Sequence, residues 1–532
     1  MELRTGTSTP GDREPAARPG NDAPGRTDQA PGDPSARDLS FVGSAAAARF
    51  VATTVTLLRA LATTVLAVRL FGASEYGFIA YGIATVDLVG SFVTGLSGAT
   101  VRSVAVMRAR SELWHLTDLL RGVTTLLVGI GTVGGGIVIT LMATKHDGDL
   151  ASRLVLGAGL GMVLVSQKAS NQAFAVAQGL RRVVLMEVPN LVNATALTAV
   201  VVALWLAHEP SILLLGVGYL GATCVSLAVT WLVLRAVVPA PYRSFGLSPN
   251  RAVRYARASA PYAAAGMATS AIANFDVMTL GLFRSTVEVG TYQPSLRVVD
   301  TLMLAPSTFL VSGYLPVAVE IHTSGTRRAF FDVYVLVSKL AYVVTFPFLL
   351  VLPVVSGPLL RSLLGPHNVA APRVVWVLLA GFFCNVALGL NSTALEAIGR
   401  GRLLGACFLA TYATTIVVTL VLVPLEGALG AALATTVSYF VMNVVMSTAL
   451  YRATGVHPFR HDQVLVVATS LVAATATYSL AHDHGTVDGL VAALLCTAGW
   501  LALVLAAGWL RVEDVGRFLP FGKGSGRARG RR

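Results

Sequence analysis

The chain has 532 residues, of which 54% are hydrophobic and only 13% are charged, with a formal net charge of +13. Soluble domains carry about 25% charged residues. The composition therefore excludes a soluble enzyme, a nucleic-acid-binding protein and a disordered chain, and it predicts an all-α polytopic membrane protein. The four cysteines lie in apolar stretches without paired spacing, which argues against a disulfide framework or a zinc site.

The first 40 residues differ from the rest of the chain. They contain six prolines, five glycines and dispersed charges without an apolar run. Such a segment cannot bury enough surface to offset the entropy of ordering, so residues 1–40 are predicted to form a disordered cytoplasmic tail. They lack the apolar core of a signal peptide. A docking role and an inert extension both remain open.

Apolar segments of about 20 residues, the length that crosses a bilayer, follow from residue 46 onward. We place fourteen of them at 46–70, 77–99, 119–143, 154–177, 188–207, 211–234, 259–283, 291–317, 330–355, 373–398, 403–423, 426–449, 463–481 and 489–510.

The basic residues are unevenly divided between the two sides of these spans. Of the 40 Lys and Arg residues, 31 fall on the side of the termini, 7 fall on the opposite side, and Arg59 and Lys168 fall within spans. The positive-inside rule then places both termini in the cytoplasm, and we expect a multi-pass protein of the cytoplasmic membrane. No loop is long enough to fold as a catalytic domain, so we expect a transporter rather than an enzyme, with no catalytic residue, cofactor, metal site or nucleic-acid partner.

Two local self-matches relate the first six spans to the next six. The first match has a constant offset of 213 and pairs Glu75-Tyr76-Gly77 and Asp87 with Glu288-Val289-Gly290 and Asp300. The second has an offset of 220 and pairs Asn171, Gly179 and Arg182 with Asn391, Gly399 and Arg402. Six spans per half make the repeat parallel, about an axis along the membrane normal.

The repeat divides the chain into two lobes and additional segments. Residues 41–258 form an N-lobe with spans 1–6 and a basic linker, and residues 259–450 form a C-lobe with spans 7–12. Residues 451–510 add spans 13 and 14, and residues 511–532 form a basic cytoplasmic tail.

Two motifs resemble those of the bacterial polysaccharide exporter family. Leu70-Phe71-Gly72-Ala73-Ser74-Glu75-Tyr76-Gly77 resembles the family's L-G-P-E-E-Y-G turn, with Ala73-Ser74 in place of the Pro and first Glu. Ala397-Ile398-Gly399-Arg400-Gly401-Arg402 and the stretch from Val423 to Thr435 resemble its G-R-x-R … P-x-x-G-x-x-G-A-A-x-A-T segment. The family belongs to the multidrug/oligosaccharidyl-lipid/polysaccharide exporter superfamily. The resemblance covers nearly all of residues 41–450.

The resemblance implies a flippase that moves a polyprenyl-diphosphate-linked glycan across the membrane by alternating access. Its other expected partners are membrane lipids, a coupling ion, and glycan polymerases or glycosyltransferases. A cation-coupled multidrug exporter of the same superfamily is one alternative. A membrane glycan polymerase or transferase is another, although the absence of a large loop argues against it.

Ionisable side chains within the predicted spans are the candidate site residues, because each costs about 2.5–3.5 kcal/mol at the centre of a bilayer. Arg59 is a candidate for binding the substrate diphosphate, and a salt bridge to Asp87 or Asp276 is its structural alternative. Lys168 and Asn171 are further candidates for substrate contacts, and packing between lobes is equally consistent with their positions.

The acidic residues in spans 2, 7 and 8 are candidates for ion coupling or conformational switching. Asp87 and Asp300 occupy equivalent positions of the repeat, and Asp276 has no evident partner in sequence. Arg297 precedes Asp300 by three residues, so a local ion pair is the favoured interpretation there. The His482-Asp483-His484 cluster is interpreted as a solvated turn rather than a metal site, and Glu396 with Arg400 as an interfacial pair.

Overall fold

The computed structural model describes residues 36–145, 149–182, 185, 187–324, 327–388, 390–455, 469–470, 472–477, 479 and 486–509. Several predictions lie outside these residues: the tail up to residue 35, the C-terminal tail, most of the thirteenth span and the His482-Asp483-His484 cluster. Helix α1 begins at Ala36, ten residues before the first predicted span.

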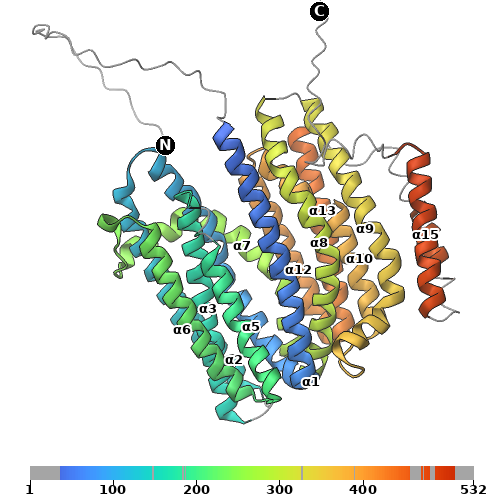
Figure 1. Cartoon of the computed structure of the whole chain (residues 1–532), viewed down its shortest axis with the longest axis horizontal. Helices are drawn as coiled ribbons and strands as arrows, with labels where there is room; N and C mark the ends of the chain where they lie inside the picture. Colours follow the sequence, from blue (N-terminus) through green and yellow to red (C-terminus); the bar gives the residue numbers. More distant parts are fainter. Residues whose placement is uncertain are drawn as a thin grey trace, which may run out of the picture. The chain divides into compact units, whose positions relative to one another are not determined.

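The described residues form helices and no strand (Figure 1). The helices are α1 (Ala36–Ala109), η1 (Leu113–His115), α2 (Leu116–Thr144), α3 (Leu150–Gly179), α5 (Val188–Ala207), α6 (Ile212–Val237), η2 (Ala240–Tyr242), α7 (Pro249–Phe283), α8 (Thr286–Ser324), α9 (Arg327–Leu364), α10 (Pro372–Leu388), α11 (Leu390–Ala397), α12 (Gly401–Glu426), α13 (Ala428–Thr454) and α15 (Thr486–Ala506). Within the described parts of the chain, ten segments are long and apolar enough to cross a membrane. The predicted fold class, an all-α polytopic membrane protein, is confirmed.

Predicted spans 1 to 9, 11, 12 and 14 each fall largely on one of these helices, and predicted span 10 covers both α10 and α11. The connection between spans 1 and 2 is shorter than the sequence indicates, because both belong to α1 and Gly72 alone interrupts it, with φ 73° and ψ 176°. An L-residue with a side chain rarely adopts a positive φ, so a glycine allows two helices to join without a loop.

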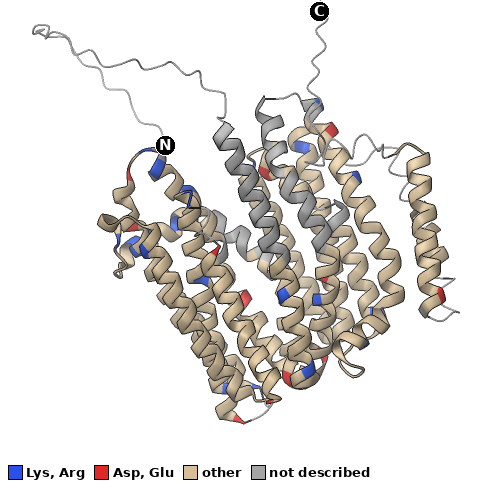
Figure 2. Cartoon of the chain, viewed as in Figure 1, with Lys and Arg blue, Asp and Glu red and all other residues tan. Residues whose placement is uncertain are grey.

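Apolar side chains lie on the outside of the helices as well as in the core. Tyr81, Phe78 and Leu160 are fully buried, whereas Leu206, Val417 and Leu495 are each more than 60% exposed. The charged residues of the described part of the chain lie mostly towards the ends of the helices, and the middle portions carry few (Figure 2). Apolar outer surfaces between charged ends are what a hydrocarbon environment requires.

Helix contacts follow a similar pattern in the two halves of the chain. Helix α3 packs against α2 and α6, and α5 packs against α6. In the second half, α10 packs against α9 and α13, and α12 packs against α13. Helix α7 contacts α2 of the first half and α12, α13 and α8 of the second. This helix therefore connects the two halves along its length.

The ends of several helices are stabilised by caps that the sequence provides. The carboxylate of Asp149 accepts a hydrogen bond of 3.0 Å from the backbone N–H of Ser152 at the start of α3, and hydrogen bonds from Ser152 lower the pKa of Asp149. Ser211 caps α6 through Leu214 in the same way. These caps fix where the two helices of the first half begin.

Candidate functional site

The turn inside α1 lies directly against the first turns of α8. A Cβ atom on Gly77 would collide with the carbonyl oxygen of Thr286, and one on Gly290 would collide with that of Ala73. The two backbones therefore touch, and only glycine fits at either position. Gly77 and Gly290 are the equivalent glycines of the repeat at offset 213. We call residues 73–77 together with residues 286–293 the clasp.

Polar side chains surround the glycine contact of the clasp. The hydroxyl of Tyr76 donates a hydrogen bond of 2.5 Å to Oε1 of Gln293, and both residues are buried. The hydroxyls of Ser74 and Thr286 lie 3.5 Å apart. The clasp therefore joins the first half of the chain to the second by backbone contact and by a buried hydrogen bond.

Two arginines attach neighbouring helix ends to the clasp region. Arg69 of α1 donates hydrogen bonds to the carbonyl oxygens of Ser362 and Leu363 at the end of α9. Arg284 donates to the carbonyl oxygens of Pro424 and Leu425, at 2.8 and 3.0 Å, at the end of α12. Terminal carbonyl groups of a helix have no partner within it, so these arginines satisfy them.

The second polysaccharide-exporter motif forms the tight junction between α12 and α13. Gly427 has φ 58°, and a Cβ on Gly430 would collide with the carbonyl oxygen of Leu422. Gly427 is thus required by its left-handed backbone conformation, and Gly430 by the close approach of the two helices. This junction is the one that Arg284 holds.

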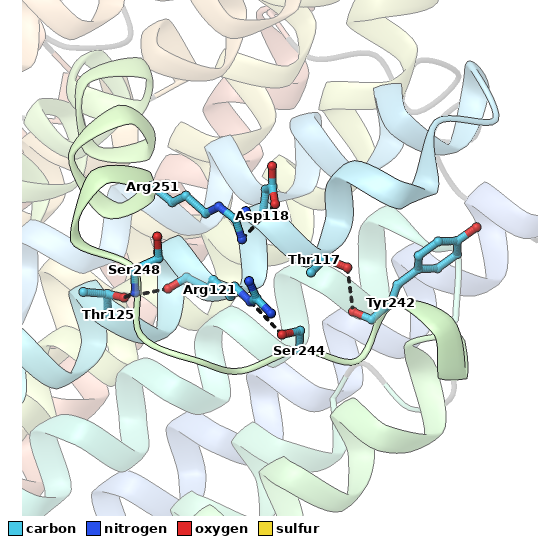
Figure 3. A network of polar contacts seen from close by, with 8 residues as sticks. All are labelled: Thr117, Asp118, Arg121, Thr125, Tyr242, Ser244, Ser248 and Arg251. Carbon is cyan, nitrogen blue, oxygen red and sulfur yellow. Dashed lines mark hydrogen bonds and ion pairs between the residues drawn. The ribbon is translucent and has the colours of Figure 1, made fainter.

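The other end of α7 is bound to α2 by a network of polar contacts (Figure 3). Arg251 lies 2.9 Å from the carboxylate of Asp118, and the backbone N–H of Ser248 donates to the hydroxyl of Thr125 at 2.7 Å. The network, which we call the anchor, consists of Thr117, Asp118, Arg121, Thr125, Tyr242, Ser244, Ser248 and Arg251. It attaches the linker between the two halves to the first half.

Tyr255, one turn further along α7, extends this attachment to α1. Its hydroxyl donates to the carbonyl oxygen of Leu96 at 2.9 Å and lies 2.5 Å from the hydroxyl of Thr100. Thr100 in turn donates to Gln172 of α3 at 2.7 Å. The first part of α7 therefore packs with the N-terminal half, of which residues up to 258 were predicted to be part.

Arg59 contacts α5 rather than the predicted acidic residues. Its Nη1 donates to the carbonyl oxygen of Ala194 at 2.9 Å and to the hydroxyl of Thr198, and its Nε is buried without a hydrogen-bond partner. Among the described residues it forms no salt bridge, with Asp87, Asp276 or any other acid. The guanidinium is half-buried.

Lys168 and Asp87 form a charged group in the first half. Lys168 is 4% exposed and packs against Gly90, three residues from Asp87 on α1. Ser270 of α7 donates to the backbone carbonyl of Asp87 at 3.3 Å. Asn171 is half-buried one turn beyond Lys168.

Asp276 of α7 has partners that the sequence did not indicate. Its Oδ2 accepts hydrogen bonds from the hydroxyls of Tyr292, at 2.6 Å, and Thr435, at 2.9 Å, and the side chain is 3% exposed. Thr435 is the last residue of the G-A-A-x-A-T motif, and this motif was the sequence feature that could have indicated the contact. The motif residue holds α13 to α7 through a buried carboxylate.

Arg297 and Asp300 are adjacent on α8 as predicted, but they are loosely paired. Their closest N–O distance is 4.0 Å, and their side chains retain 35% and 19% exposure. Asp276 is bound to the same helix through the hydroxyl of Tyr292, so all three ionisable residues lie on or contact α8. Helix α7 connects Asp87 with Asp276. Ser270, which contacts the backbone of Asp87, lies on this helix about 9 Å from Asp276 along its axis.

The remaining sequence candidates that the structure describes do not form a metal or ion-pair site. Within the described segments, no group of three or more His, Cys, Asp or Glu residues could hold a metal ion. Glu396 and Arg400 form no ion pair there either. Asn391, the counterpart of Asn171, is fully buried, accepting a hydrogen bond from Tyr334 and donating one to Ser447.

Comparison with protein families identifies the family to which the chain belongs. The polysaccharide biosynthesis protein family matches residues 46–322, which is more than half of the sequence. The chain belongs to this family. The comparison with curated proteins gives no match.

Solved structures share the fold of this family member at low sequence identity. The lipid II flippase MurJ, in an inward closed conformation, is 14% identical, with a TM-score of 0.66 over 86% of this chain and 99% of that chain. An inward-facing multidrug resistance MATE transporter of the MOP superfamily is 12% identical, with a TM-score of 0.59 over 75% and 94%. A MOP superfamily transporter from Pyrococcus furiosus is 11% identical, with a TM-score of 0.54 over 78% and 95%.

Proposed function

We propose that this protein is a flippase that carries a polyprenyl-diphosphate-linked glycan from the cytoplasmic to the outer leaflet of the cytoplasmic membrane. Its family is one of polysaccharide biosynthesis, and its fold is shared with a lipid II flippase. The number of basic residues on the side of the termini supports cytoplasmic N- and C-termini. Transport requires no bond to be broken in the glycan, so we infer no catalytic step.

The partly exposed pair of Arg297 and Asp300 carries this proposal. Their neighbours Leu296, Val298 and Val299 are 6%, 2% and 3% exposed, whereas Arg297 is 35% exposed. A guanidinium facing hydrocarbon is costly, so the space beside Arg297 must be filled by water or by a polar ligand. The 4.0 Å pair leaves the guanidinium free to bind a diphosphate through two parallel hydrogen bonds.

The other charged residues have supporting roles in the proposal. Binding of a diphosphate to Arg297 would separate it from Asp300 and change the electrostatic environment of Asp276. The change on α7 would reach Lys168 and Asp87 in the first half, because Ser270 of α7 donates a hydrogen bond to the backbone carbonyl of Asp87. Arg59 and Asn171 would contact the substrate when the halves separate, since both are half-buried. A coupling ion would act on the same acids.

The clasp and the anchor give alternating access a structural basis. With cytoplasmic termini, the clasp lies on the outer side, because α1 begins at the cytoplasm and Gly72 follows its first crossing. The clasp would then close the path to the outer leaflet and would open when the two lobes rotate apart. The anchor would keep the first part of α7 with the N-lobe throughout. Two lobes of six spans are consistent with the recurring helix contacts.

Transport of a fluorescent lipid-linked oligosaccharide in proteoliposomes tests the function. We expect the purified protein to move the lipid to the opposite leaflet, where a membrane-impermeant quencher reaches it. Arg297→Ala is expected to abolish this movement and Arg297→Lys to retain part of it, since lysine keeps the charge but makes no bidentate contact. Arg361→Ala is the matched control, because Arg361 is exposed and bonds its own helix at Gly357.

A parallel set of variants tests the first half. Arg59→Ala is expected to reduce transport at normal protein levels and Arg59→Lys to restore part of it, since one ammonium can still donate to Ala194. In the preceding experiment on the second half, wild-type transport by both Arg297 variants would contradict the proposed binding of the diphosphate by Arg297.

The MATE-like fold keeps a multidrug exporter as the second candidate. Deletion of the gene separates the two. Loss of surface glycan without increased drug sensitivity supports the flippase, and increased drug sensitivity with normal glycan supports the exporter. Formation of glycosidic bonds by the purified protein would indicate the polymerase or transferase alternative instead.

A further inference from the structure

A pocket with two arginines lies between the beginning of α12 and the end of α13. Its volume is about 610 Å³, and its lining includes Arg400, Leu403, Val445, Thr448 and Arg452. We propose that this pocket binds the phosphate headgroup of an anionic phospholipid from the leaflet at that end of the helices. The site is separate from the charged groups on α1, α3, α7 and α8, so it is independent of the proposed transport function.

Both arginines are available to a ligand. Arg400 is the residue before the first turn of α12, and Arg452 lies in the last turn of α13. Both are exposed, and among the described residues neither forms a salt bridge. The first N–H groups of α12 also lack partners within their helix. Two guanidinium groups that converge on one pocket suit a phosphate, which accepts bidentate hydrogen bonds.

The wall of the pocket changes from polar to apolar along one face of α13. Arg452, Thr448, Val444 and Phe440 follow each other at intervals of four residues and therefore lie on the same side of the helix. All four are exposed, with Val444 at 47% and Phe440 at 56%. A charged end followed by an apolar stripe matches a phospholipid, whose headgroup would meet Arg452 while an acyl chain lies along Val444 and Phe440.

This gradient favours a lipid over a free anion. Inorganic phosphate would use the arginines but not the apolar stripe. Basic pockets between membrane helices bind anionic headgroups, and the charge of such a leaflet adds to the attraction. Arg402 provides a matched control, because it is an exposed arginine two residues from Arg400 that does not line the pocket.

Native mass spectrometry of the full-length protein, released from nanodiscs with equal amounts of phosphatidylglycerol and phosphatidylcholine, tests the proposal. We expect retained phosphatidylglycerol to exceed phosphatidylcholine. Its affinity should fall by about tenfold or more in Arg400→Ala/Arg452→Ala, since each arginine contributes independently. Arg402→Ala should retain it, and Arg400→Lys/Arg452→Lys should retain part of it, which keeps the test informative if the alanine variant fails to fold.

Several outcomes would overturn the proposal. Equal retention of both lipids would show that charge does not select the ligand. An equal loss in Arg402→Ala would indicate general attraction to a basic surface. Competition by millimolar inorganic phosphate as effective as that by phosphatidylglycerol would identify an anion site rather than a lipid site.

Discussion

The clasp joins the two halves of the chain, whereas the anchor attaches the linker and the start of α7 to the first half, and the two contacts use different chemistry. In the clasp, Gly77 and Gly290 bring backbone against backbone, and a buried hydrogen bond from Tyr76 to Gln293 accompanies them. In the anchor, an exposed salt bridge and several separate hydrogen bonds connect side chains of α2 with the linker. A backbone contact at glycines either forms or does not, whereas separate polar bonds can be lost one at a time. The clasp therefore suits an interface that opens, and the anchor one that persists.

The largest effect is expected from a covalent lock across the clasp. The Ser74 and Thr286 hydroxyls are 3.5 Å apart, close enough for cysteines there to form a disulfide. Oxidation of Ser74→Cys/Thr286→Cys, in a chain lacking the four native cysteines, should block transport completely, and a reductant should restore it. Ser74→Cys with Val287→Cys is the control, because Val287 is exposed. Undiminished transport by the cross-linked protein would show that the clasp does not open.

Bulky side chains at the clasp glycines should have the next largest effect. Gly77→Val or Gly290→Val should prevent closure, because overpacking costs about 1–3 kcal/mol and the colliding atoms belong to backbone. A free-energy cost of this size corresponds to a fall in transport of about tenfold or more. A cysteine at Ser74 should then react faster with an impermeant maleimide. Gly136→Val is the control, since nothing lies within 4 Å of a Cβ at that position.

The buried hydrogen bond of the clasp should contribute less than its glycines. Tyr76→Phe leaves the Gln293 amide oxygen buried without its donor, which costs about 1–3 kcal/mol. Thermal unfolding of the purified protein should show the loss, and Tyr76→Phe/Gln293→Leu should recover most of it because neither polar group is then left unpaired. Unfolding of Tyr76→Phe at the wild-type temperature would contradict this account.

The smallest effect is expected in the anchor. The side chains of Arg251 and Asp118 are 32% and 45% exposed, so solvent screens their salt bridge, and Arg251→Gln should reduce stability by no more than about 1 kcal/mol. The charge-reversed pair Asp118→Arg/Arg251→Asp should restore it. A loss of stability in Arg251→Gln as large as that in Tyr76→Phe would contradict the proposed difference between the anchor and the clasp.

Local sequence patterns predicted those parts of the site that depend on one helix. Arg297 and Asp300 are paired because residues three apart share a helix face. The equivalence of Gly77 and Gly290 was visible in the repeat, and Thr435 stood in a recognisable motif. Their contacts were not predictable, because each partner lies on a helix distant in sequence. The salt bridge suggested for Arg59 is not formed, since α5 supplies a backbone carbonyl and a hydroxyl in place of a carboxylate.

The sequence by itself determined the membrane class, the position of the helices and the residue types that must avoid lipid. These follow from local composition and from the cost of placing charge in hydrocarbon, which act on each segment separately. Only the tertiary structure decided which helices satisfy Arg59 and Asp276, and that two equivalent glycines meet. Those outcomes depend on how helices hundreds of residues apart pack, where side-chain volume and hydrogen-bond partners must fit simultaneously.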